Sequence, residues 1–590
     1  MCGIFGYVGK KQNATTSVLN GLKRLDYRGY DSWGIAILRD QKIVVDKHTG
    51  IVDKSLLTLP ESSIAIGHTR WATNGAVTVP NAHPHWASDK SFVLAHNGIA
   101  ENYMEIKAEL ERKGYTFVSE TDTEVIVHLI EEKRKIVHEL QEAVRLAFNE
   151  LTGRNTVIVL SNDGHIIAAR NGSPLVIGVE KDFSEIYLSS DTLSFAPYVS
   201  DIIILDNGQM VTCYQKRVTV HDIKSGRQIE YALEKNTIVD SKVDKEKYDH
   251  FMMKEIHEEP FVVRRVFEQS HQKYQKLADA IKKARTVYCI GSGTAGAAAF
   301  QTTYYLRVYG HVPAIGLIGA EARDYYDLIG KEDIVIAPSQ SGETADVLEV
   351  LEEVKKKGAT IVSFVNMPGS MMTRLSDFKF MAEAGPEICV MSTKIFISQI
   401  AWGYLVAKTV QDKFTEGKRT LEKLENQIHN YLQDTDVHKT VKRLASLLAG
   451  KRDIFLLSKG QNLQIIKEGM VKIIEGSYVH AHAIPAGDLK HYAITLMEHG
   501  VPVIFVVSND SVRMDLINAL NEVKARGSDI IGIAPQKEKG FDEYIHVPDA
   551  GEVSAIANVV PLQLLAYYMA VGLKHNVDKP RNIAKSVTVK

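Results

Sequence analysis

A cysteine follows the initiator methionine, so the chain beginning Met1-Cys2-Gly3-Ile4 has Cys2 at its N-terminus once the methionine is removed. The thiol and the free α-amine then belong to one residue. A thiolate attacks only after a base has taken its proton, and an α-amine with a pKa near ~8 can be that base close to neutral pH. Taken alone, Cys2 is more simply an arbitrary second residue, but the segments downstream favour a self-activated nucleophile.

Three downstream segments supply the groups that hydrolysis of an amide at Cys2 requires. The dipeptide Asn97-Gly98 offers a side-chain amide and a backbone N–H that can hold the oxyanion of a tetrahedral intermediate. Arg70 can bind the carboxylate of a free amino acid, and Asp122 can pair with its ammonium group. Taken singly, Asn97-Gly98 is typical of a turn and Asp122 of a helix cap. Together with Cys2 they meet the needs of one reaction, which predicts hydrolysis of an amino-acid amide.

The C-terminal half contains a candidate phosphate site and candidate groups for proton transfer. The segment Ser339-Gln-Ser-Gly-Glu-Thr344 lies between a predicted strand and a predicted helix, where backbone N–H groups and hydroxyls fit a phosphate, with a hydroxyl-rich helix cap as the alternative. Lys472 and Glu475 are three residues apart, hence on one face of a helix, and their apolar neighbours predict partial burial. His491 lies in a predicted loop, and the tail 578–589 has no periodicity, which is typical of a frayed terminus.

The elements that must position these residues change in kind along the chain. Residues 2 to about 215 are strand-rich, with a hairpin predicted around Asn162-Asp163-Gly164 and a helical pattern over 121–150, which predicts an α+β block. After a polar, charged stretch, buried strands alternate with helices, so we predict α/β structure with parallel, doubly wound sheets. The plan occurs twice, as a weak internal repeat. The predicted strands of the two α/β units are 286–290, 333–337, 360–365, 454–457, 501–507 and 530–533, with a helix over 511–526.

The composition is that of a globular protein large enough for several cores, with 590 residues, 45% of them hydrophobic and 24% charged. A formal net charge of −2 points to neither a nucleic-acid nor a membrane partner. The four cysteines show no CxxC spacing, which argues against a disulfide framework or a zinc site. We see no signal peptide and no apolar run of transmembrane length, so we expect a cytoplasmic protein that uses no metal or other cofactor.

Six segments of the first block together resemble the N-terminal-nucleophile glutamine amidotransferases. These segments are Cys2-Gly-Ile4, Tyr27-Arg-Gly-Tyr-Asp-Ser32, His68-Thr-Arg-Trp-Ala-Thr73, Asn81-Ala-His-Pro-His85, His96-Asn-Gly98 and Ser119-Glu-Thr-Asp-Thr-Glu124. The resemblance implies a four-layer αββα sandwich over residues 2–220. It implies that Cys2 is the nucleophile and its α-amine the base, and that Asn97 and Gly98 form the oxyanion hole. Glutamine would be bound by Arg70, Thr73 and Asp122, with Trp71 at the substrate site near the gate of an internal path for ammonia.

The rest of the chain resembles the sugar isomerase (SIS) domains that accompany this glutaminase in amidotransferases of phosphosugars. The most specific segments are Ser339–Thr344, Ser392-Thr-Lys394, Pro561-Leu-Gln-Leu-Leu565 and Pro580-Arg-Asn-Ile-Ala-Lys-Ser-Val-Thr-Val589. The resemblance implies a linker over 221–248 and two flavodoxin-like SIS domains, at 249–435 and 440–590. The second domain would include the C-terminal tail.

The same resemblance implies roles in the sugar chemistry. The residues that would hold the phosphosugar are Ser292, Ser339, Gln340, Ser341, Thr344, Val390 and Ser392. His491 would assist ring opening, Lys585 would form a Schiff base with the C2 carbonyl, and Lys472 would lie beside it. Glu475 would move a proton between C1 and C2. The implied reaction converts L-glutamine and fructose 6-phosphate to L-glutamate and glucosamine 6-phosphate, and the implied assembly is a homodimer.

The sequence departs from the family pattern mainly in the sugar-binding half. The first sugar loop reads Ile290-Gly-Ser-Gly293 where Cys-Gly-Thr-Ser is usual, His482 replaces a glutamate, and Tyr492 replaces a glycine; in the glutaminase half Asn74 replaces a histidine. Two alternatives therefore stay open. One is a paralogue that aminates or deglycates another phosphosugar, and the other is a sugar-phosphate sensor that binds without catalysis. A sensor would need none of the candidate sugar-site acids and bases, which weighs against it.

Overall fold

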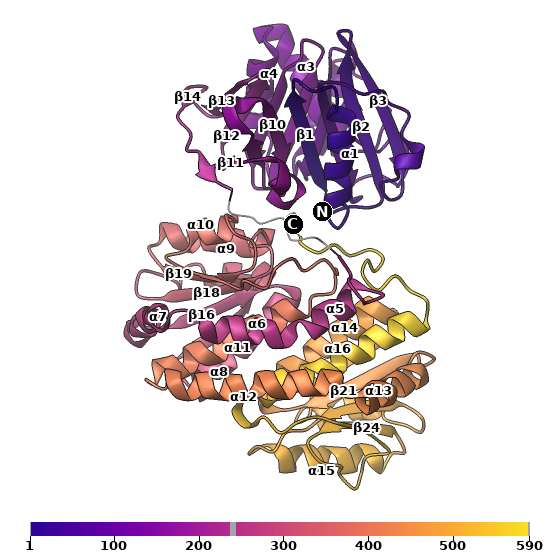
Figure 1. Ribbon diagram of the computed structural model, residues 1–590, viewed down its shortest axis with the longest axis vertical. Coiled ribbons are helices and arrows are strands. Elements are labelled where there is room, and N and C mark those ends of the chain that lie inside the picture. The colour runs from indigo at the N-terminus through magenta and orange to yellow at the C-terminus, as the bar shows by residue number, and fades with distance from the viewer. Residues whose placement is uncertain (1, 237–243, 588–590) are drawn as a thin grey trace. The chain divides into compact units, whose positions relative to one another are not determined.

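A computed structural model describes residues 2–236 and 244–587 (Figure 1). The chain divides into two compact units, one made of Met1–Lys242 with Ala584–Lys590 and the other of Val243–Ile583. The residues from Ala584 onward thus group with the first unit, whereas we expected the whole tail to belong to the second SIS domain. We describe each unit by itself.

Two antiparallel sheets form the centre of the first unit. In spatial order, the eight-stranded sheet consists of β15 (Glu234–Lys235), β11 (Asp201–Ile204), β9 (Val176–Val179), β10 (Glu185–Ser189), β1 (Gly3–Gly9), β4 (Ile64–Arg70), β2 (Ser32–Arg39) and β3 (Lys42–Thr49). The seven-stranded sheet consists of β14 (Gln228–Ile229), β13 (Arg217–Asp222), β12 (Gln209–Tyr214), β8 (Ile166–Asn171), β7 (Asn155–Ser161), β6 (Phe92–Gly98) and β5 (His85–Trp86). The predicted hairpin is confirmed, because Leu160 of β7 pairs with Ile166 of β8.

Helices cover the outer faces of both sheets. The helix α1 (Ala14–Arg24) packs on the sheet that contains β1 and β4 (Figure 1), and its Val18 and Leu22 share a core with Phe5. On the other sheet lie α2 (Tyr103–Arg112), α3 (Asp122–Val137) and α4 (Leu140–Glu150). A third core between the sheets joins Ile4 of β1 to Ile158 of β7. The predicted αββα sandwich is therefore confirmed.

Two details of this unit differ from the sequence-based expectation. The helical pattern over 121–150 is two helices, because His138 has a positive φ of 57° and ends α3. The expected linker over 221–248 begins with structure, since β14 and β15 add edge strands to the two sheets. These strands are two residues long each, too short for an alternating apolar pattern to mark them. Residues 237–243 of the expected linker lie outside the described residues.

The second unit contains two parallel five-stranded sheets with the same strand order. The first is β17 (Ala314–Ile318), β16 (Val287–Gly291), β18 (Ile334–Ser339), β19 (Thr360–Val365) and β20 (Phe378–Met381). The second is β22 (His480–Pro485), β21 (Asp453–Ser458), β23 (Pro502–Val506), β24 (Asp529–Ala534) and β25 (Glu543–His546). Both have the second strand in the chain at the edge beside the first, which is the flavodoxin-like order. The predicted repeat and the doubly wound class are confirmed.

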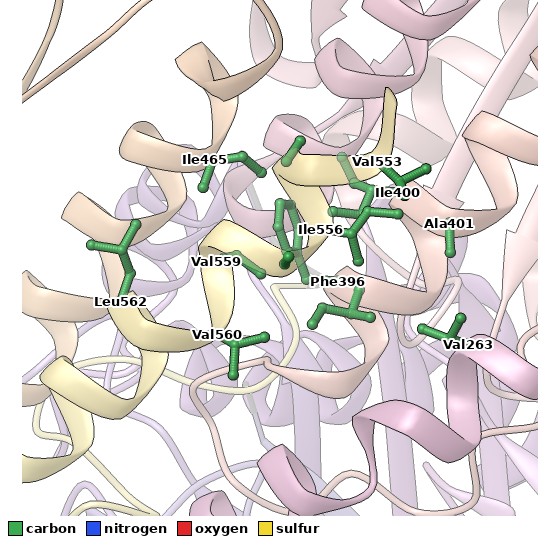
Figure 2. Packing of buried hydrophobic residues seen from close by; sticks show 14 of the residues in the cluster. Val263, Phe396, Ile400, Ala401, Ile465, Val553, Ile556, Val559, Val560 and Leu562 are labelled. Atoms are coloured by element: carbon green, nitrogen blue, oxygen red, sulfur yellow. The ribbon is translucent and has the colours of Figure 1, made fainter. Parts of the chain in front are cut away.

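The helices of this unit flank both sheets. Those of the first half are α5 (Phe251–His257), α6 (Glu259–Glu268), α7 (His271–Lys283), α8 (Gly293–Val308), α9 (Ala345–Lys356), α10 (Met371–Leu375), α11 (Lys394–Val410) and α12 (Phe414–Gln433). Those of the second half are α13 (Thr435–Leu448), α14 (Leu463–Ser477), α15 (Arg513–Lys524) and α16 (Ser554–Gly572). One hydrophobic cluster runs through both halves, so the two SIS folds share a core. Figure 2 shows α16 residues packed between Ile465 of α14 and Phe396 and Ile400 of α11.

The helix α16 corrects one expectation from the sequence. The segment Gly551–Gly572 has a mean hydropathy of 1.4 and is long and apolar enough to span a membrane, contrary to our expectation that no apolar run reaches this length. Of its most apolar window, 83% is buried inside the protein. Burial on all sides is the environment of a core helix. Such a helix is apolar on every face, like a membrane span, because no face of it contacts water.

Candidate functional site

Cys2 lies at the start of β1, where the next residue, Gly3, pairs with Thr69 of β4. The Cys2 Sγ accepts a hydrogen bond from the backbone N–H of Trp71 at 3.3 Å and donates to Trp71 O at 3.6 Å. Burial raises the pKa of the thiol, while the Trp71 N–H and the charge of Arg70 act to lower it. The sulfur is thus held in place and needs a base before it can attack.

Arg70 ends β4 and shapes the loop that follows. Its guanidinium donates to Asn74 O at 2.5 Å, to Gly75 O at 3.0 Å and to Ala76 O at 3.2 Å. The carboxylate of Glu120 accepts from Ala76 N at 3.0 Å and so ties this loop to the segment before α3. A guanidinium has five N–H groups, so donors remain for a substrate carboxylate.

Asn97 and Gly98 end β6, beside β7. Gly98 has a φ of 136°, and a Cβ there would lie 2.2 Å from Arg154 O, so only glycine fits. Asn97 is 2% exposed, and its Oδ1 lies 3.1 Å from His68 Nε2. Because the oxygen end of the amide faces His68, the nitrogen end faces away from that ring, as an oxyanion donor must.

Asp122 is the first residue of α3 and is buried. Flanking side chains fix this helix start, because Thr121 Oγ1 accepts from Glu124 N at 3.4 Å and Glu124 Oε2 accepts from Ser119 N at 2.7 Å. The capping residue is Thr121, and Asp122 follows it as the first residue of the helix. Asp122 Oδ2 accepts from Ala100 N at 2.9 Å, so the carboxylate lies beside the chain just after the end of β6.

The sandwich therefore brings four of the expected glutaminase groups together. The charges of Arg70 and Asp122 both act on the Cys2 thiol. Asn97 lies on β6 of the other sheet and contacts His68, two residues before Arg70 on β4. Trp71 is half-buried and Thr73 is exposed on the loop after β4. Their contacts with glutamine stay predictions.

The expected phosphate segment forms the turn between β18 and α9. Ser339 Oγ accepts from Gly342 N at 2.9 Å, and Ser341 Oγ accepts from Glu343 N at 3.2 Å. Two backbone N–H groups that could have met a phosphate are therefore used inside the turn. Thr344 precedes α9, and in the described structure its side chain makes no capping hydrogen bond. Hydroxyls at a helix start suit an anion, and phosphate binding here stays a prediction.

Ser292 lies close to this turn, and Gln340 is part of it. Ser292 precedes α8, and a Cβ built on Gly319 would lie 2.6 Å from Ser292 Oγ and 3.4 Å from Asp346 Cβ of α9. The Oγ of Ser292 is buried and has no hydrogen-bond partner among the described residues, as a group awaiting a polar ligand would be. Gln340 O accepts from Asn366 N at 3.3 Å, which anchors the turn to the end of β19.

The stretch 390–392 lies against α14. Val390 N donates to Asp578 O at 2.9 Å, and Ser392 Oγ donates to Glu387 Oε2 at 2.9 Å. A Cβ on Gly476 would lie 3.4 Å from Met391 Sδ, so the end of α14 passes directly beside this stretch. The structure thus brings the predicted sugar-binding stretch next to the helix that carries Lys472 and Glu475.

Lys472 and Glu475 share one face of α14, as predicted. Lys472 Nζ lies 2.6 Å from Glu475 Oε2 and 3.4 Å from Glu468 Oε1. Burial alone would lower the pKa of Lys472, but the two carboxylates raise it. Burial also raises the pKa of Glu468, to about 7. The side chain of Lys472 is 1% exposed and that of Glu475 23%, so Glu475 is the member that a substrate can reach.

Glu468 is a candidate functional residue that we did not predict. Its side chain is 0% exposed, and its Oε1 accepts from Thr294 Oγ1 at 3.1 Å, at the start of α8. The signal was present in the sequence, since residues 468, 472 and 475 recur at helical spacing. A glutamate between Lys467 and Gly469 is expected to face solvent. Only the packing of α8 against α14 shows that it is buried.

His491 and Lys585, the two other residues expected in the sugar chemistry, lie outside α14. His491 ends the 3₁₀ turn Leu489–His491 after β22 and is exposed, and among the described residues no hydrogen bond or ion pair joins it to α14. Lys585 belongs to the other compact unit. Their roles in the sugar chemistry stay predictions.

Family matches agree with this division of the chain. The SIS domain family matches residues 280–408 and 447–573, and the glutamine amidotransferase domain family matches residues 68–196. A glutamine--fructose-6-phosphate aminotransferase (isomerizing) from Pyrococcus horikoshii is 37% identical over 611 residues, covering 100% of both chains. The enzyme of the same name from Clostridium tetani is 36% identical over 613 residues, again covering 100% of both. The solved C-terminal domain of glucosamine-fructose-6-phosphate aminotransferase from Francisella tularensis is 30% identical, with a TM-score of 0.52 over 57% of this chain and 100% of that one.

The fold, the cysteine site and these matches define a glutamine amidotransferase domain followed by two SIS domains. More particularly, the chain belongs to the family of the glutamine--fructose-6-phosphate aminotransferases (isomerizing).

Proposed function

We propose that this chain converts L-glutamine and fructose 6-phosphate to L-glutamate and glucosamine 6-phosphate. Relatives with this named activity match it over their whole length. The observation that carries the proposal is the Cys2 thiol, which is hydrogen-bonded to the Trp71 backbone and interacts electrostatically with Arg70 and Asp122. Amide hydrolysis by an N-terminal cysteine needs this set of groups.

In the first half-reaction, the α-amine of Cys2 takes the thiol proton and the sulfur attacks the side-chain carbonyl of glutamine. Asn97 and the N–H of Gly98 stabilise the oxyanion while the C–N bond breaks and ammonia leaves. Water then hydrolyses the thioester and releases glutamate. Arg70, Thr73 and Asp122 hold the carboxylate and ammonium of the substrate, with Trp71 beside them.

In the second half-reaction, the turn Ser339–Thr344 with Ser292, Val390 and Ser392 holds the phosphosugar. His491 assists ring opening, and Lys585 forms a Schiff base at C2 with loss of water. Ammonia displaces the lysine, and Glu475 takes a proton from C1 and returns one to C2. The step is redox-neutral, since the carbonyl oxidation level moves from C2 to C1. Lys472, paired with Glu475 at 2.6 Å, holds that carboxylate in place.

The proposal extends to nitrogen transfer, assembly and location. Ammonia is mostly protonated at neutral pH and is then not nucleophilic, so we propose that it passes from Cys2 to the sugar inside the protein. We also propose a homodimer and, because the four cysteines are free, a reducing cytoplasmic location. Light scattering on the purified chain tests the dimer.

A single labelled assay tests the main proposal. The purified chain is incubated with amide-¹⁵N glutamine, fructose 6-phosphate and excess unlabelled ammonium, and the product is identified by mass. We expect ¹⁵N-glucosamine 6-phosphate. No amino sugar from fructose 6-phosphate would contradict the substrate, whereas amination of another ketose phosphate would favour the paralogue. Unlabelled glucosamine 6-phosphate would contradict internal transfer of ammonia but not the choice of substrate.

The variant Cys2→Ala separates the two half-reactions. We expect it to abolish glutamine hydrolysis and to leave slow isomerisation of fructose 6-phosphate to glucose 6-phosphate, because the acid–base groups of α14 are untouched. Hydrolysis is measured as glutamate release and isomerisation by a coupled glucose 6-phosphate assay. Loss of both activities would contradict the division into two sites.

A further inference from the structure

We propose that His68 is a positioning residue that holds the side-chain amide of Asn97 in the one orientation that serves the oxyanion. This inference rests on the proposed glutaminase function. His68 lies in the middle of β4, between Ile4 of β1 and Gly34 of β2. Its ring contacts β6, in the other sheet of the sandwich, where Asn97 is found.

The contacts of the His68 ring fix where its hydrogen lies. Nε2 faces two oxygen atoms, His96 O at 3.0 Å and Asn97 Oδ1 at 3.1 Å. Both atoms are acceptors, so Nε2 must carry the hydrogen and donate. Burial lowers the pKa of His68 to about 3, so the ring is neutral near pH 7 and has a single N–H. The other nitrogen, Nδ1, is buried with no hydrogen-bond partner among the described residues, which suits an unprotonated nitrogen.

Neighbouring side chains hold the ring itself. The ring of His83 lies 4.2 Å from that of His68, centroid to centroid, and His83 Nδ1 accepts from His96 N at 3.4 Å. His68 is 0% exposed. A ring packed in this way donates along one fixed direction.

A fixed donor selects one of the two flips of the Asn97 amide. The oxygen and nitrogen ends of an amide are nearly equal in size, so packing alone discriminates weakly between them. The N–H of His68 donates only to the oxygen end, which leaves the two N–H bonds of Asn97 Nδ2 directed away from it. The opposite flip would present an oxygen atom to the developing oxyanion and remove a donor. Loss of one such donor costs about 10²–10³ in kcat.

A matched pair of variants tests this role. Glutamine and methionine have similar length and volume, but only glutamine carries an N–H near the position of Nε2. We expect His68→Met to lower kcat for glutamine hydrolysis by about 10²-fold, with KM changed less than about threefold, and His68→Gln to recover most of that loss. Wild-type hydrolysis that depends on Cys2 establishes the proposed function independently of either variant.

Two controls separate positioning from structural damage. Alkylation of Cys2 by iodoacetamide passes through no oxyanion, so its rate is expected to stay unchanged in His68→Met. In the Asn97→Ala background the difference between the Met and Gln variants is expected to vanish, because His68 acts through Asn97. Unchanged hydrolysis in His68→Met, parallel loss of hydrolysis and alkylation, or additive effects with Asn97→Ala would each overturn the proposal. Where His68→Met does not fold, His68→Leu, which also lacks an N–H, takes its place under the same criteria.

Discussion

Three titratable side chains on α14 form one electrostatic unit, and the structure adds a member that the sequence motif does not contain. Lys472 is buried between Glu468 and Glu475, at 3.4 Å and 2.6 Å. An ammonium buried with one carboxylate is neutral as a pair, whereas a second carboxylate adds a charge that changes with pH. Because burial raises the pKa of Glu468 to about 7, this charge changes at a pH close to neutral.

A pH–rate profile of sugar isomerisation tests the role of Glu468. Above pH 7 its carboxylate adds negative charge beside Lys472 and competes with Glu475 for that ammonium. We expect the isomerisation rate to show an inflection near pH 7 in the wild type and none there in Glu468→Gln. Thr294→Val removes a hydrogen bond that lowers the pKa of Glu468, so we expect its inflection at higher pH. Identical profiles in all three proteins would contradict the assignment.

At this scale, the sequence predicts residues whose chemistry is carried by local motifs. Cys2, Asn97 and Asp122 stand in short, recognisable segments, and the structure brings them together. His68 and Glu468 escape prediction because each acts through a contact between elements, from β4 to β6 and from α14 to α8. A residue that works through such a contact has no local signature beyond its type.

Among the elements, the end of α14 is joined to the start of the C-terminal tail by a stack of three side chains. The rings of Tyr478 and His575 stack at 4.3 Å, and the Arg581 guanidinium lies 4.2 Å from the centre of the Tyr478 ring. Arg581 N also donates to Tyr478 Oη at 2.9 Å. The tail that leads to Lys585 is therefore anchored at the helix that carries Glu475.

Removing the stack is expected to release the tail. A cation–π contact and a hydrogen bond together contribute about 1–2 kcal/mol, so Tyr478→Ala should raise tryptic cleavage after Arg581 by about 5–30-fold. Tyr478→Phe keeps the stack and should raise it less. Fragments are quantified by mass spectrometry, and Tyr492→Ala, at a side chain 49% exposed, is the control. Equal cleavage in all variants would show that the stack does not hold the tail.

The elements that the sequence predicts are those with long apolar runs. The buried strands β16, β18, β19, β21, β23 and β24 were all predicted to within two residues. The edge strands escaped, since β22 reads His-Ala-His-Ala-Ile-Pro and β17 has two exposed isoleucines. A strand covered on one side only, or paired on one edge only, needs fewer apolar residues and resembles a loop.

For the whole molecule, buried histidines are unevenly divided between the two units. In the first unit, burial lowers the pKa values of four almost wholly buried histidines: His68, His83, His85 and His96. In the unfolded chain these side chains take up protons as the pH falls below about 6.5, while the folded unit does not. Unfolding is therefore favoured as the pH falls from 6.5, by about 1.4 kcal/mol per pH unit for each histidine that stays neutral.

His128 has the opposite effect on the pH dependence of stability, because it makes the folded unit less stable as the pH rises. Although burial alone would lower the pKa of His128, Glu124 and Glu131 raise it to about 9. Its contribution to stability is fully present below about pH 6.5 and is lost as the pH rises toward 9. We therefore expect the first unit to be most stable near pH 6.5 and to unfold before the second unit in acid. Three of the four tryptophans, Trp33, Trp71 and Trp86, lie in the first unit, so fluorescence during urea titration reports mainly on it.

The pH dependence can be assigned to these histidines by substitution. Amide hydrogen exchange in the buried strands of the second unit is followed in parallel with fluorescence at pH 5, 6, 7 and 8. His83→Gln removes one histidine from the buried set and should reduce the acid slope of the unfolding free energy by about 1.4 kcal/mol per pH unit. His128→Gln should flatten the decline between pH 7 and 9 and leave the acid slope intact. His138→Asn, at an exposed position, should change neither slope. If the first unit keeps its full stability at pH 5, the slope does not arise from buried neutral histidines. The folded and unfolded states would then take up equal numbers of protons.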